Sequence, residues 1–192
     1  HTAYRRQRQM CIRDRYRFAD SKICSVLLVF KKTNRCLVYA SLSQDRSRLF
    51  KIVGKEFQQL SKKTHISYKL IRDTNDEYED ESEEFISIME GSITTPNLIH
   101  YEYLFGTDFQ RKVWDQLLAI PFGQTRSYGQ VASAMGDIKK SRAVGRACGA
   151  NNIPVIIPCH RVLGSTGDYV SFTWGVPIKK ALLFSEGFKE VK

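Results

Sequence analysis

The feature that most constrains the fold is the regular division of the second half of the chain by helix start and stop signals. Two capping boxes, which begin at Thr107 and Ser127, each mark a helix start, because the Thr or Ser and the Gln three residues later satisfy free backbone donors. Glycine or proline follows where each helix is expected to end. The predicted helices span residues 107–120, 127–135, 141–148 and 177–185. The two short central helices have the outline of a helix-turn-helix.

The first half predicts a small sheet with helices. Residues 23–30 and 35–42 are apolar runs separated by a polar turn, which favours a β-hairpin. A helix over 44–60 and a third strand over 65–71 are expected to follow. Residues 73–84 are dense in acidic side chains, which indicates a solvated or disordered loop.

The net charge of +10 is unevenly distributed. Residues 1–17 hold six arginines and one aspartate, residues 18–102 carry a net charge of −1, and residues 103–192 carry +6. The run from Met10 to Arg15 resembles a translated sequencing adapter and lacks apolar periodicity, so we interpret residues 1–17 as an artefact tail outside the fold. A basic arm that binds nucleic acid is the alternative. The excess charge of the last segment favours a polyanion such as DNA.

Several classes of protein are not expected. No apolar run reaches the roughly 18 residues that a membrane-spanning helix needs, and the arginine-rich N-terminus lacks the apolar core of a secretory signal. The five cysteines are widely spaced, which indicates thiols in a reducing compartment. No zinc-type spacing occurs, although Cys24, Cys36, His65 and His100 remain an alternative metal cluster. We therefore predict no metal and no cofactor.

One short motif could carry chemistry. An apolar run over residues 153–157 predicts a buried strand that delivers Cys159, His160 and Arg161 at its end. A thiolate is a good nucleophile, and neighbouring cations raise the thiolate fraction. Because adjacent side chains of extended chain point to opposite faces, a Cys–His contact needs a bend or a bridging water. A buried cysteine beside a surface His-Arg pair is the alternative.

The expected helix over 141–148 is unusually rich in small residues. Ala143, Gly145 and Ala147 would let it approach another surface closely, either a neighbouring helix or a nucleic-acid groove. Arg142 and Arg146 flank these residues and favour the groove.

Together these motifs resemble the O6-alkylguanine-DNA alkyltransferases, also called methylated-DNA–protein-cysteine methyltransferases. The resemblance covers residues 103–188 and rests on Pro-Cys-His-Arg at 158–161, on Arg-Ala-Val-Gly at 142–145 and on two motifs at 106–114 and 120–132. It implies an α+β fold with two domains. Residues 18–102 would form an RNase H-like antiparallel sheet with helices, and residues 103–192 a winged helix-turn-helix-like domain that binds DNA and accepts the alkyl group.

The resemblance also implies a function. The chain would repair double-stranded DNA by flipping O6-alkylguanine, mainly O6-methylguanine, out of the duplex and transferring the alkyl group once to Cys159. His160 would reach Cys159 through a water, and Glu186 would orient His160. Tyr128 would donate toward the guanine, and Arg142, on the helix that enters the minor groove, would fill the gap left by the flipped base.

Further site residues follow from the same resemblance. The expected DNA-binding residues are Ser127, Tyr128, Arg142, Ala143, Gly145 and Arg146. The expected pocket residues are Asn151, Pro154, Val162, Phe172, Thr173 and Trp174, with Asn151 as a hinge. Trp174 stands where many members have glycine, which would narrow the pocket and favour methyl over benzyl adducts.

Two other classes of function remain as alternatives. One is a DNA binder without catalysis, such as a winged-helix regulator or an alkyltransferase-like lesion sensor; such sensors lack the cysteine that this chain has. The other is a cysteine hydrolase, which would need an oxyanion hole. The expected protein is a monomer with no membrane partner, with cooperative binding on DNA left open, and it acts in the nucleus of a eukaryote or the cytoplasm of a bacterium.

Overall fold

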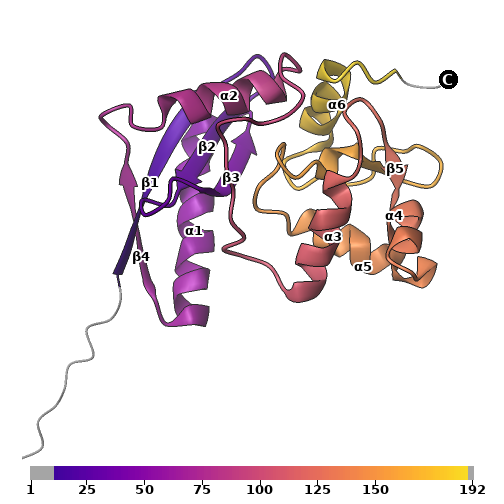
Figure 1. Ribbon diagram of the computed structural model, residues 1–192, viewed down its shortest axis with the longest axis horizontal. Coiled ribbons are helices and arrows are strands. Elements are labelled where there is room, and N and C mark those ends of the chain that lie inside the picture. The colour runs from indigo at the N-terminus through magenta and orange to yellow at the C-terminus, as the bar shows by residue number, and fades with distance from the viewer. Residues whose placement is uncertain (1–10, 190–192) are drawn as a thin grey trace, which may run out of the picture.

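The computed structural model describes residues 11–189, which form a sheet-containing half and a helical half (Figure 1). The strands are β1 (Cys11–Asp20), β2 (Ser25–Phe30), β3 (Leu37–Ser43), β4 (Ser67–Arg72), β5 (Arg126–Ser127) and β6 (Val162–Leu163). The α-helices are α1 (Arg46–Thr64), α2 (Glu79–Met89), α3 (Asp108–Leu118), α4 (Tyr128–Ala134), α5 (Ser141–Gly149) and α6 (Val176–Ser185). Two 3-10 turns, η1 (Ile138–Lys140) and η2 (Cys159–Arg161), complete the described elements. The expected α+β class is confirmed.

The sheet has the strand order β3-β2-β1-β4. The predicted hairpin is present as β2 and β3, and the predicted third strand is β4. The expectation of an antiparallel sheet is wrong for one pair, because β4 runs parallel to β1. The sheet is therefore mixed, since the chain crosses over through α1 before it returns to the far side of β1.

The expectation that residues 1–17 stand outside the fold is wrong for residues 11–17. These residues belong to β1, which pairs with β2 on one side and β4 on the other. Tyr16 and Phe18 pack onto the core cluster beneath α1. Backbone pairing on two sides holds β1 in place, and one of its partners, β4, follows in the chain only after α1. The expected domain boundary at residue 18 thus falls inside a strand, and residues 1–10 lie outside the described residues.

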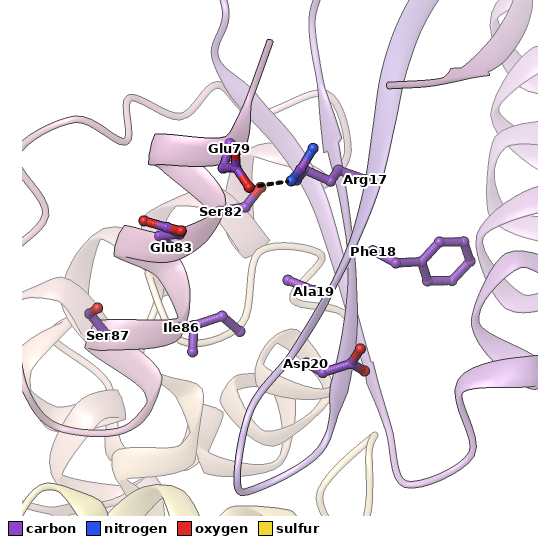
Figure 2. Close-up of a pocket in the computed structure, with 9 residues that line it drawn as sticks. All are labelled: Arg17, Phe18, Ala19, Asp20, Glu79, Ser82, Glu83, Ile86 and Ser87. Carbon is purple, nitrogen blue, oxygen red and sulfur yellow. Dashed lines mark hydrogen bonds and ion pairs between the residues drawn. The ribbon is translucent and has the colours of Figure 1, made fainter. Parts of the chain in front are cut away.

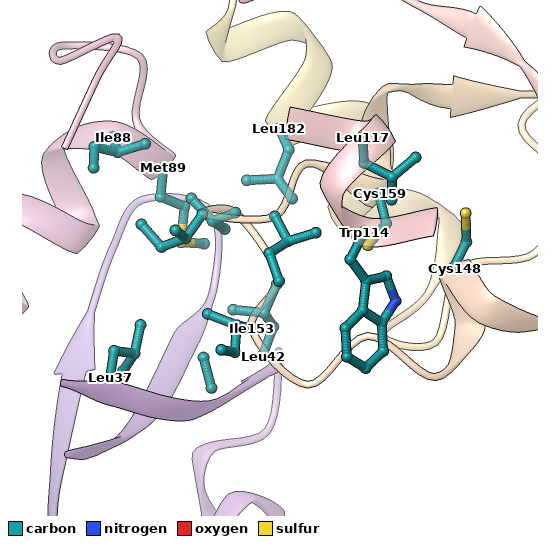
Figure 3. Packing of buried hydrophobic residues seen from close by; sticks show 14 of the residues in the cluster. Leu37, Leu42, Ile88, Met89, Trp114, Leu117, Cys148, Ile153, Cys159 and Leu182 are labelled. Atoms are coloured by element: carbon teal, nitrogen blue, oxygen red, sulfur yellow. The ribbon is translucent and has the colours of Figure 1, made fainter. Parts of the chain in front are cut away.

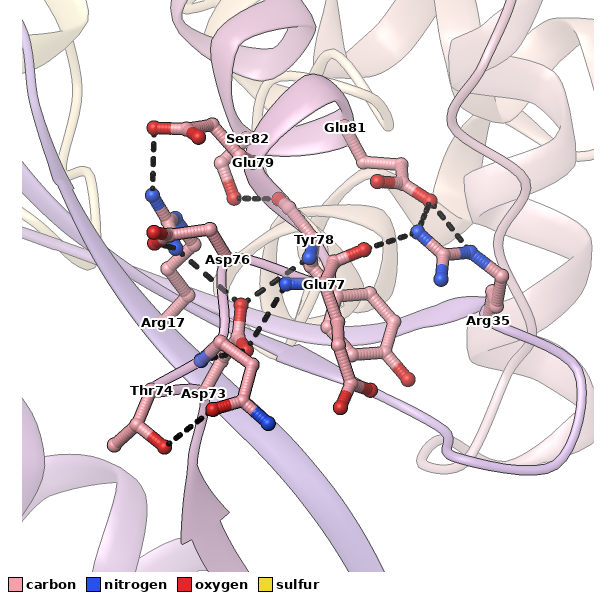
Figure 4. Close-up of polar contacts among 11 residues, drawn as sticks. Arg17, Arg35, Asp73, Thr74, Asp76, Glu77, Tyr78, Glu79, Glu81 and Ser82 are labelled. Atoms are coloured by element: carbon pink, nitrogen blue, oxygen red, sulfur yellow. Dashed lines mark hydrogen bonds and ion pairs between the residues drawn. The ribbon is translucent and has the colours of Figure 1, made fainter.

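The acidic stretch 73–84 is also more ordered than predicted, because it contains the start of α2. Figure 4 shows how arginines of the sheet half meet this segment. Arg17 pairs with Asp73, Asp76 and Glu79, and Arg35 pairs with Glu81. Three acidic residues in the first turn of α2 also complement the positive end of the helix dipole. The negative charges are therefore compensated by arginines distant in sequence.

Helices cover both faces of the sheet. On one face of the sheet, side chains of β2 and β3 pack with α1 in one apolar cluster. On the other face, side chains of the same strands pack with α2 and the helical half in a second cluster. Figure 3 shows this second cluster continuing from Leu37 and Leu42 to Trp114, Leu117 and Leu182. The two halves thus share one apolar core, which fixes the helical half against the sheet.

The polar side of α2 is separated from β1 by a groove of about 390 Å³ (Figure 2). Arg17 reaches across it to Glu79, with a separation of 3.1 Å. Among residues 11–189, no helix is both long enough and apolar enough to cross a membrane.

Candidate active site

The residues before Cys159 do not form the predicted strand. Val155 has a φ of 72°, in the left-handed region that a β-branched residue rarely adopts, and Ile157 N–H donates to the carbonyl of Ile153 at 3.0 Å. Pro154 and Pro158 cannot donate to a strand ladder. The chain therefore folds back on itself, and Cys159 begins the short turn η2.

The Cys159 thiol is buried and held by an amide. Its side chain belongs to the core, and the residue is 2% exposed. Asn151 Nδ2 donates to Sγ at 3.1 Å and to the carbonyl of Ile157 at 2.9 Å. Burial raises the pKa of Cys159 to about 11, against the opposing effects of Asn151 and the charge of Lys179. The thiol is consequently protonated at neutral pH, so a reaction at sulfur needs a proton acceptor.

His160 and Glu186 form a buried pair in the same region. His160 Nε2 lies 2.7 Å from Glu186 Oε1, and the carboxylate can only accept, so Nε2 carries the proton. Arg161 donates three further hydrogen bonds to the carboxylate, and Gly123 N–H donates another at 3.0 Å. Burial alone would raise the pKa of Glu186, but His160 and Arg161 lower it to about 2.

The imidazole is arranged to accept a proton. Burial lowers the pKa of His160, although Glu186 opposes this, so the ring is neutral near pH 7. Its Nδ1 is buried and has no hydrogen-bond partner within residues 11–189. The ring is therefore neutral, and the Glu186 carboxylate holds its Nε2–H while Nδ1 is available to accept a proton. This is the arrangement of a general base that a carboxylate orients.

A hollow of about 330 Å³ opens beside α5. It is lined by Tyr128, Ser141, Arg142, Gly145, Val170 and Ser171. A Cβ atom on Gly145 would lie 3.7 Å from the ring of Tyr128, so α4 and α5 approach closely at this point. Burial raises the pKa of Tyr128 to about 12, and charge on Cys148 and Cys159 contributes. Tyr128 lines the hollow and keeps its proton at neutral pH.

The structure separates the small residues of α5 into two groups. Ala143 and Gly145 are half-buried, and Gly145 lines the hollow, whereas Ala147 is buried and its carbonyl accepts from Trp114 Nε1 at 2.8 Å. Arg142 and Arg146 are both exposed. Both predicted capping boxes are present, so Ser127 caps α4 directly beside Tyr128.

The expected pocket residues lie around this centre in different ways. Thr173 Oγ1 donates to the carbonyl of Gly149 at 2.8 Å, which ties the loop to the end of α5. Phe172 and Trp174 pack edge to face, 5.1 Å apart, and lie against the core, while Val170 and Ser171 line the hollow. Asn151, Pro154 and Val162 are buried.

Lys179 is a site residue that the sequence did not reveal. It is fully buried on α6, and its Nζ donates to the carbonyls of Val162 at 2.6 Å and Val170 at 3.2 Å. Burial lowers its pKa, against the opposing charges of Cys159 and Cys148. Through these two hydrogen bonds, Lys179 connects Val170, which lines the hollow, to Val162 of β6. Its only sequence signal is a lysine within an apolar stretch of the predicted helix.

The described cysteines are all free thiols. Cys11 is exposed and Cys36 is half-buried, whereas Cys24, Cys148 and Cys159 are buried. Within residues 11–189, no group of three His, Cys, Asp or Glu side chains gathers as a metal site.

Comparisons with known proteins agree on one family. The model of the DNA-binding domain of 6-O-methylguanine DNA methyltransferase matches residues 108–188. The methylated-DNA–protein-cysteine methyltransferase of Candida glabrata is 36% identical over 178 residues, which cover 89% of this chain and 85% of the relative. The protein of the same name from Kluyveromyces lactis is 39% identical over 181 residues, covering 89% and 95%. The structure resembles Mycobacterium tuberculosis OGT in complex with DNA, with a TM-score of 0.66, 31% identity and coverage of 90% and 92%.

Proposed function

This chain belongs to the methylated-DNA–protein-cysteine methyltransferase family, and from this premise we propose that it repairs DNA by moving the alkyl group of O6-alkylguanine onto its own Cys159. The surroundings of that thiol carry the proposal. Asn151 donates to its sulfur, the next residue is a neutral His160 oriented by the ionised Glu186, and Tyr128 lines the hollow beside α5. The proposal assigns Cys159 as the nucleophile, His160 as the base and the hollow as the space for the nucleobase.

The transfer is a single displacement. The sulfur of Cys159 forms a bond to the alkyl carbon while the bond from that carbon to O6 breaks and leaves its electron pair on the guanine. The thiol proton passes through a water to Nδ1 of His160, and Glu186 stabilises the imidazolium. The Tyr128 hydroxyl donates a hydrogen bond to the departing base, which finally takes up the proton that the thiol released. The product is a thioether, so each molecule acts once and needs no cofactor.

DNA binding falls to the helical half. We propose that α4, η1 and α5 act as a helix-turn-helix-like unit of a winged domain, with Ala143, Gly145 and Arg146 of α5 in the minor groove. Removing a base from the stack costs a few kcal/mol. Arg142 is exposed at the rim of the hollow, so it can occupy the gap in the duplex. The Mycobacterium tuberculosis relative was solved with DNA, which supports this partner.

Other features are proposed on the same basis. The mixed sheet with its flanking helices would be RNase H-like, and the protein would act as a monomer, with cooperative binding along DNA as an alternative. Because the substrate is chromosomal DNA, the protein would work in the nucleus of a eukaryotic cell or in the cytoplasm of a bacterium. Trp174 packs on Phe172 next to the loop residues Val170 and Ser171 that line the hollow, and we propose that it narrows access to the hollow and favours methyl as the main substrate.

The test is to incubate the protein with duplex DNA that carries O6-methylguanine and to measure its intact mass and the modified peptide. We expect one methyl group on Cys159 and saturation at one equivalent. Cys159→Ala should keep DNA binding and lose transfer. Arg142→Ala should slow transfer from duplex DNA more than from the free base. O6-benzylguanine in the same duplex should react more slowly than O6-methylguanine.

The controls separate the alternatives. A protein that binds damaged DNA without gaining mass would be a lesion sensor rather than a transferase. Methyl on Cys148 or Cys24 instead of Cys159 would contradict the assignment of the acceptor. An equal benzyl rate, unchanged by Trp174→Gly, would remove the proposed preference for methyl.

A further inference from the structure

The edge strand of the N-terminal sheet makes direct contact with the loop that holds the acceptor cysteine. β3 is an edge strand of the sheet, and its backbone amide at Ala40 donates to the carbonyl of Asn152 at 2.8 Å. Tyr39, the preceding residue, is buried, and the Asn152 side chain interacts with its hydroxyl closely enough to oppose the rise that burial causes in the pKa of Tyr39. Asn152 is therefore attached to the sheet through both its backbone and its side chain.

Asn152 directly follows the residue that contacts the thiol. The Asn151 amide nitrogen donates to Ile157 and Cys159, and its oxygen accepts from Ile153 N–H at 2.9 Å. All three partners belong to the same loop, so they fix Asn151 within the loop but do not fix the loop in space. The contacts of Asn152 with β3 supply an anchor from another part of the fold.

The conformation of this loop shows that it needs such an anchor. Val155 has a φ of 72°, and a β-branched residue keeps a left-handed conformation only where its surroundings enforce it. Ile153, which precedes Val155 in the loop, belongs to the same core cluster as Leu42 of β3 (Figure 3). The sheet thus holds the N-terminal part of the loop, which begins at Asn151.

We infer that the N-terminal sheet positions the reactive thiol, with Tyr39 and Asn152 as positioning residues that keep the Asn151 amide on Cys159. The inference rests on the proposed function only in naming Cys159 as the alkyl acceptor. It gives the sheet half a role in the reaction, although that half contributes no group to the hydrogen bonds of the sulfur itself among the described residues.

The measurable consequence is the acidity of the thiol. A hydrogen bond donated to sulfur stabilises the thiolate, so a displaced Asn151 amide would raise the pKa of Cys159 further. The other groups that face this thiol are Cys148 on α5, Tyr128 on α4, Lys179 on α6 and His160 in its own turn, with Glu186 behind it. None of these lies on β3, so loss of the Tyr39 hydroxyl changes none of their charges directly.

The experiment compares Tyr39→Phe, Asn152→Ala and Asn151→Ala in the full chain. The rate of Cys159 modification by iodoacetamide is measured against pH, beside methyl transfer from DNA and DNA affinity. We expect Tyr39→Phe to move the iodoacetamide profile to higher pH and to slow transfer up to about tenfold, the scale of one hydrogen bond, at unchanged DNA affinity. Tyr68→Phe is the matched control, since Tyr68 packs on the same Phe57 ring, and it should change neither readout.

The double variants decide the mechanism. If Tyr39 acts through Asn151, Tyr39→Phe adds no further effect once Asn151→Ala is present. Equal slowing in both backgrounds, or an unmoved pH profile in Tyr39→Phe and Asn152→Ala, would overturn the inference. The iodoacetamide profile needs no DNA, so a shifted profile in a protein that transfers no methyl would refute the proposed function and leave the positioning role intact.

Discussion

At the scale of single residues, Glu186 connects the last helix to the reactive turn. Its carboxylate accepts from His160, Arg161 and Gly123, and its side chain is 5% exposed. Removing one partner of a buried carboxylate–arginine pair is destabilising, because the other charge is left buried and unpaired. The residue that orients the proposed base is thus also a structural link between α6 and η2.

We therefore predict a specific pH dependence for Glu186→Gln. The pKa of Glu186 is lowered from 4.5 to about 2, so the carboxylate stabilises the fold fully above pH 4.5 and loses this contribution as pH falls toward 2. At pH 7 the variant should be less stable by about 3 kcal/mol, because Arg161 is left buried and unpaired. The deficit should shrink at pH 3, as measured by urea unfolding at both pH values.

Glu102→Gln is the matched control, since Glu102 pairs with Lys31 at 2.7 Å but is 43% exposed. Its loss should change stability by less than about 1 kcal/mol at pH 7. A Glu186→Gln deficit that is the same at pH 7 and pH 3 would contradict the assigned role of the carboxylate.

At the scale of elements, Ser127 is assigned two roles, one as a helix cap and one as a DNA contact, and a pair of variants can separate them. It caps α4, and the family resemblance also predicts a contact with DNA. Ser127→Ala should cost about 1 kcal/mol of stability, whereas Ser127→Asp should preserve the cap. If Ser127 faces a phosphate, the added negative charge should weaken duplex binding at least about tenfold, measured by fluorescence anisotropy.

Thr107→Asp tests the same capping box at the start of α3, away from the hollow. It should leave both stability and DNA affinity close to those of the wild type. Unweakened binding by Ser127→Asp would show that Ser127 serves only as a cap.

The elements that the sequence predicted correctly are those with local signals. Capping boxes and glycine or proline stops lie within one or two turns, so α3, α4 and α6 were expected close to their observed bounds. β1 and the start of α2 were missed because they depend on partners far along the chain, strand pairing for β1 and the arginines Arg17 and Arg35 for the acidic segment. The expected strand before Cys159 failed because an apolar run does not distinguish a strand from a buried irregular loop.

The site shows the same division. The resemblance placed Cys159, His160 and Glu186 in one centre, and the structure brings His160 and Glu186 into contact. Lys179 and the contact of Asn152 with β3 were not expected. Both depend on how α6 and the sheet pack against the loop, which no spacing along the chain encodes.

At the scale of the whole molecule, charge is arranged by element. In the sheet half, α1 has six basic residues and one acidic residue, and α2 has five acidic residues and no basic one. In the helical half, Lys139, Lys140, Arg142 and Arg146 are exposed on η1 and α5. The near-neutral net charge of the sheet half thus conceals a basic and an acidic helix on different faces (Figure 1).

This arrangement predicts which lysine side chains contact DNA phosphates. Each phosphate contact contributes about 0.9 to the slope of log affinity against log salt. Replacing Lys139 and Lys140 by glutamine should therefore reduce the slope by up to about 1.8, if both lysines contact phosphates. The matched pair Lys51→Gln and Lys55→Gln on α1 should leave the slope unchanged, in salt titrations on one undamaged duplex. Equal losses for the two pairs would place DNA on the sheet half as well.

The unequal accessibility of the thiols has a practical consequence. Cys11 at the start of β1 is exposed, whereas Cys159 is enclosed in the core. A bulky maleimide fluorophore, added briefly and in limited amount, should attach at Cys11 and spare the acceptor. Single labelled molecules could then be followed as they scan stretched DNA and stop at a lesion. The Cys159 sulfur would remain unlabelled and able to accept the alkyl group.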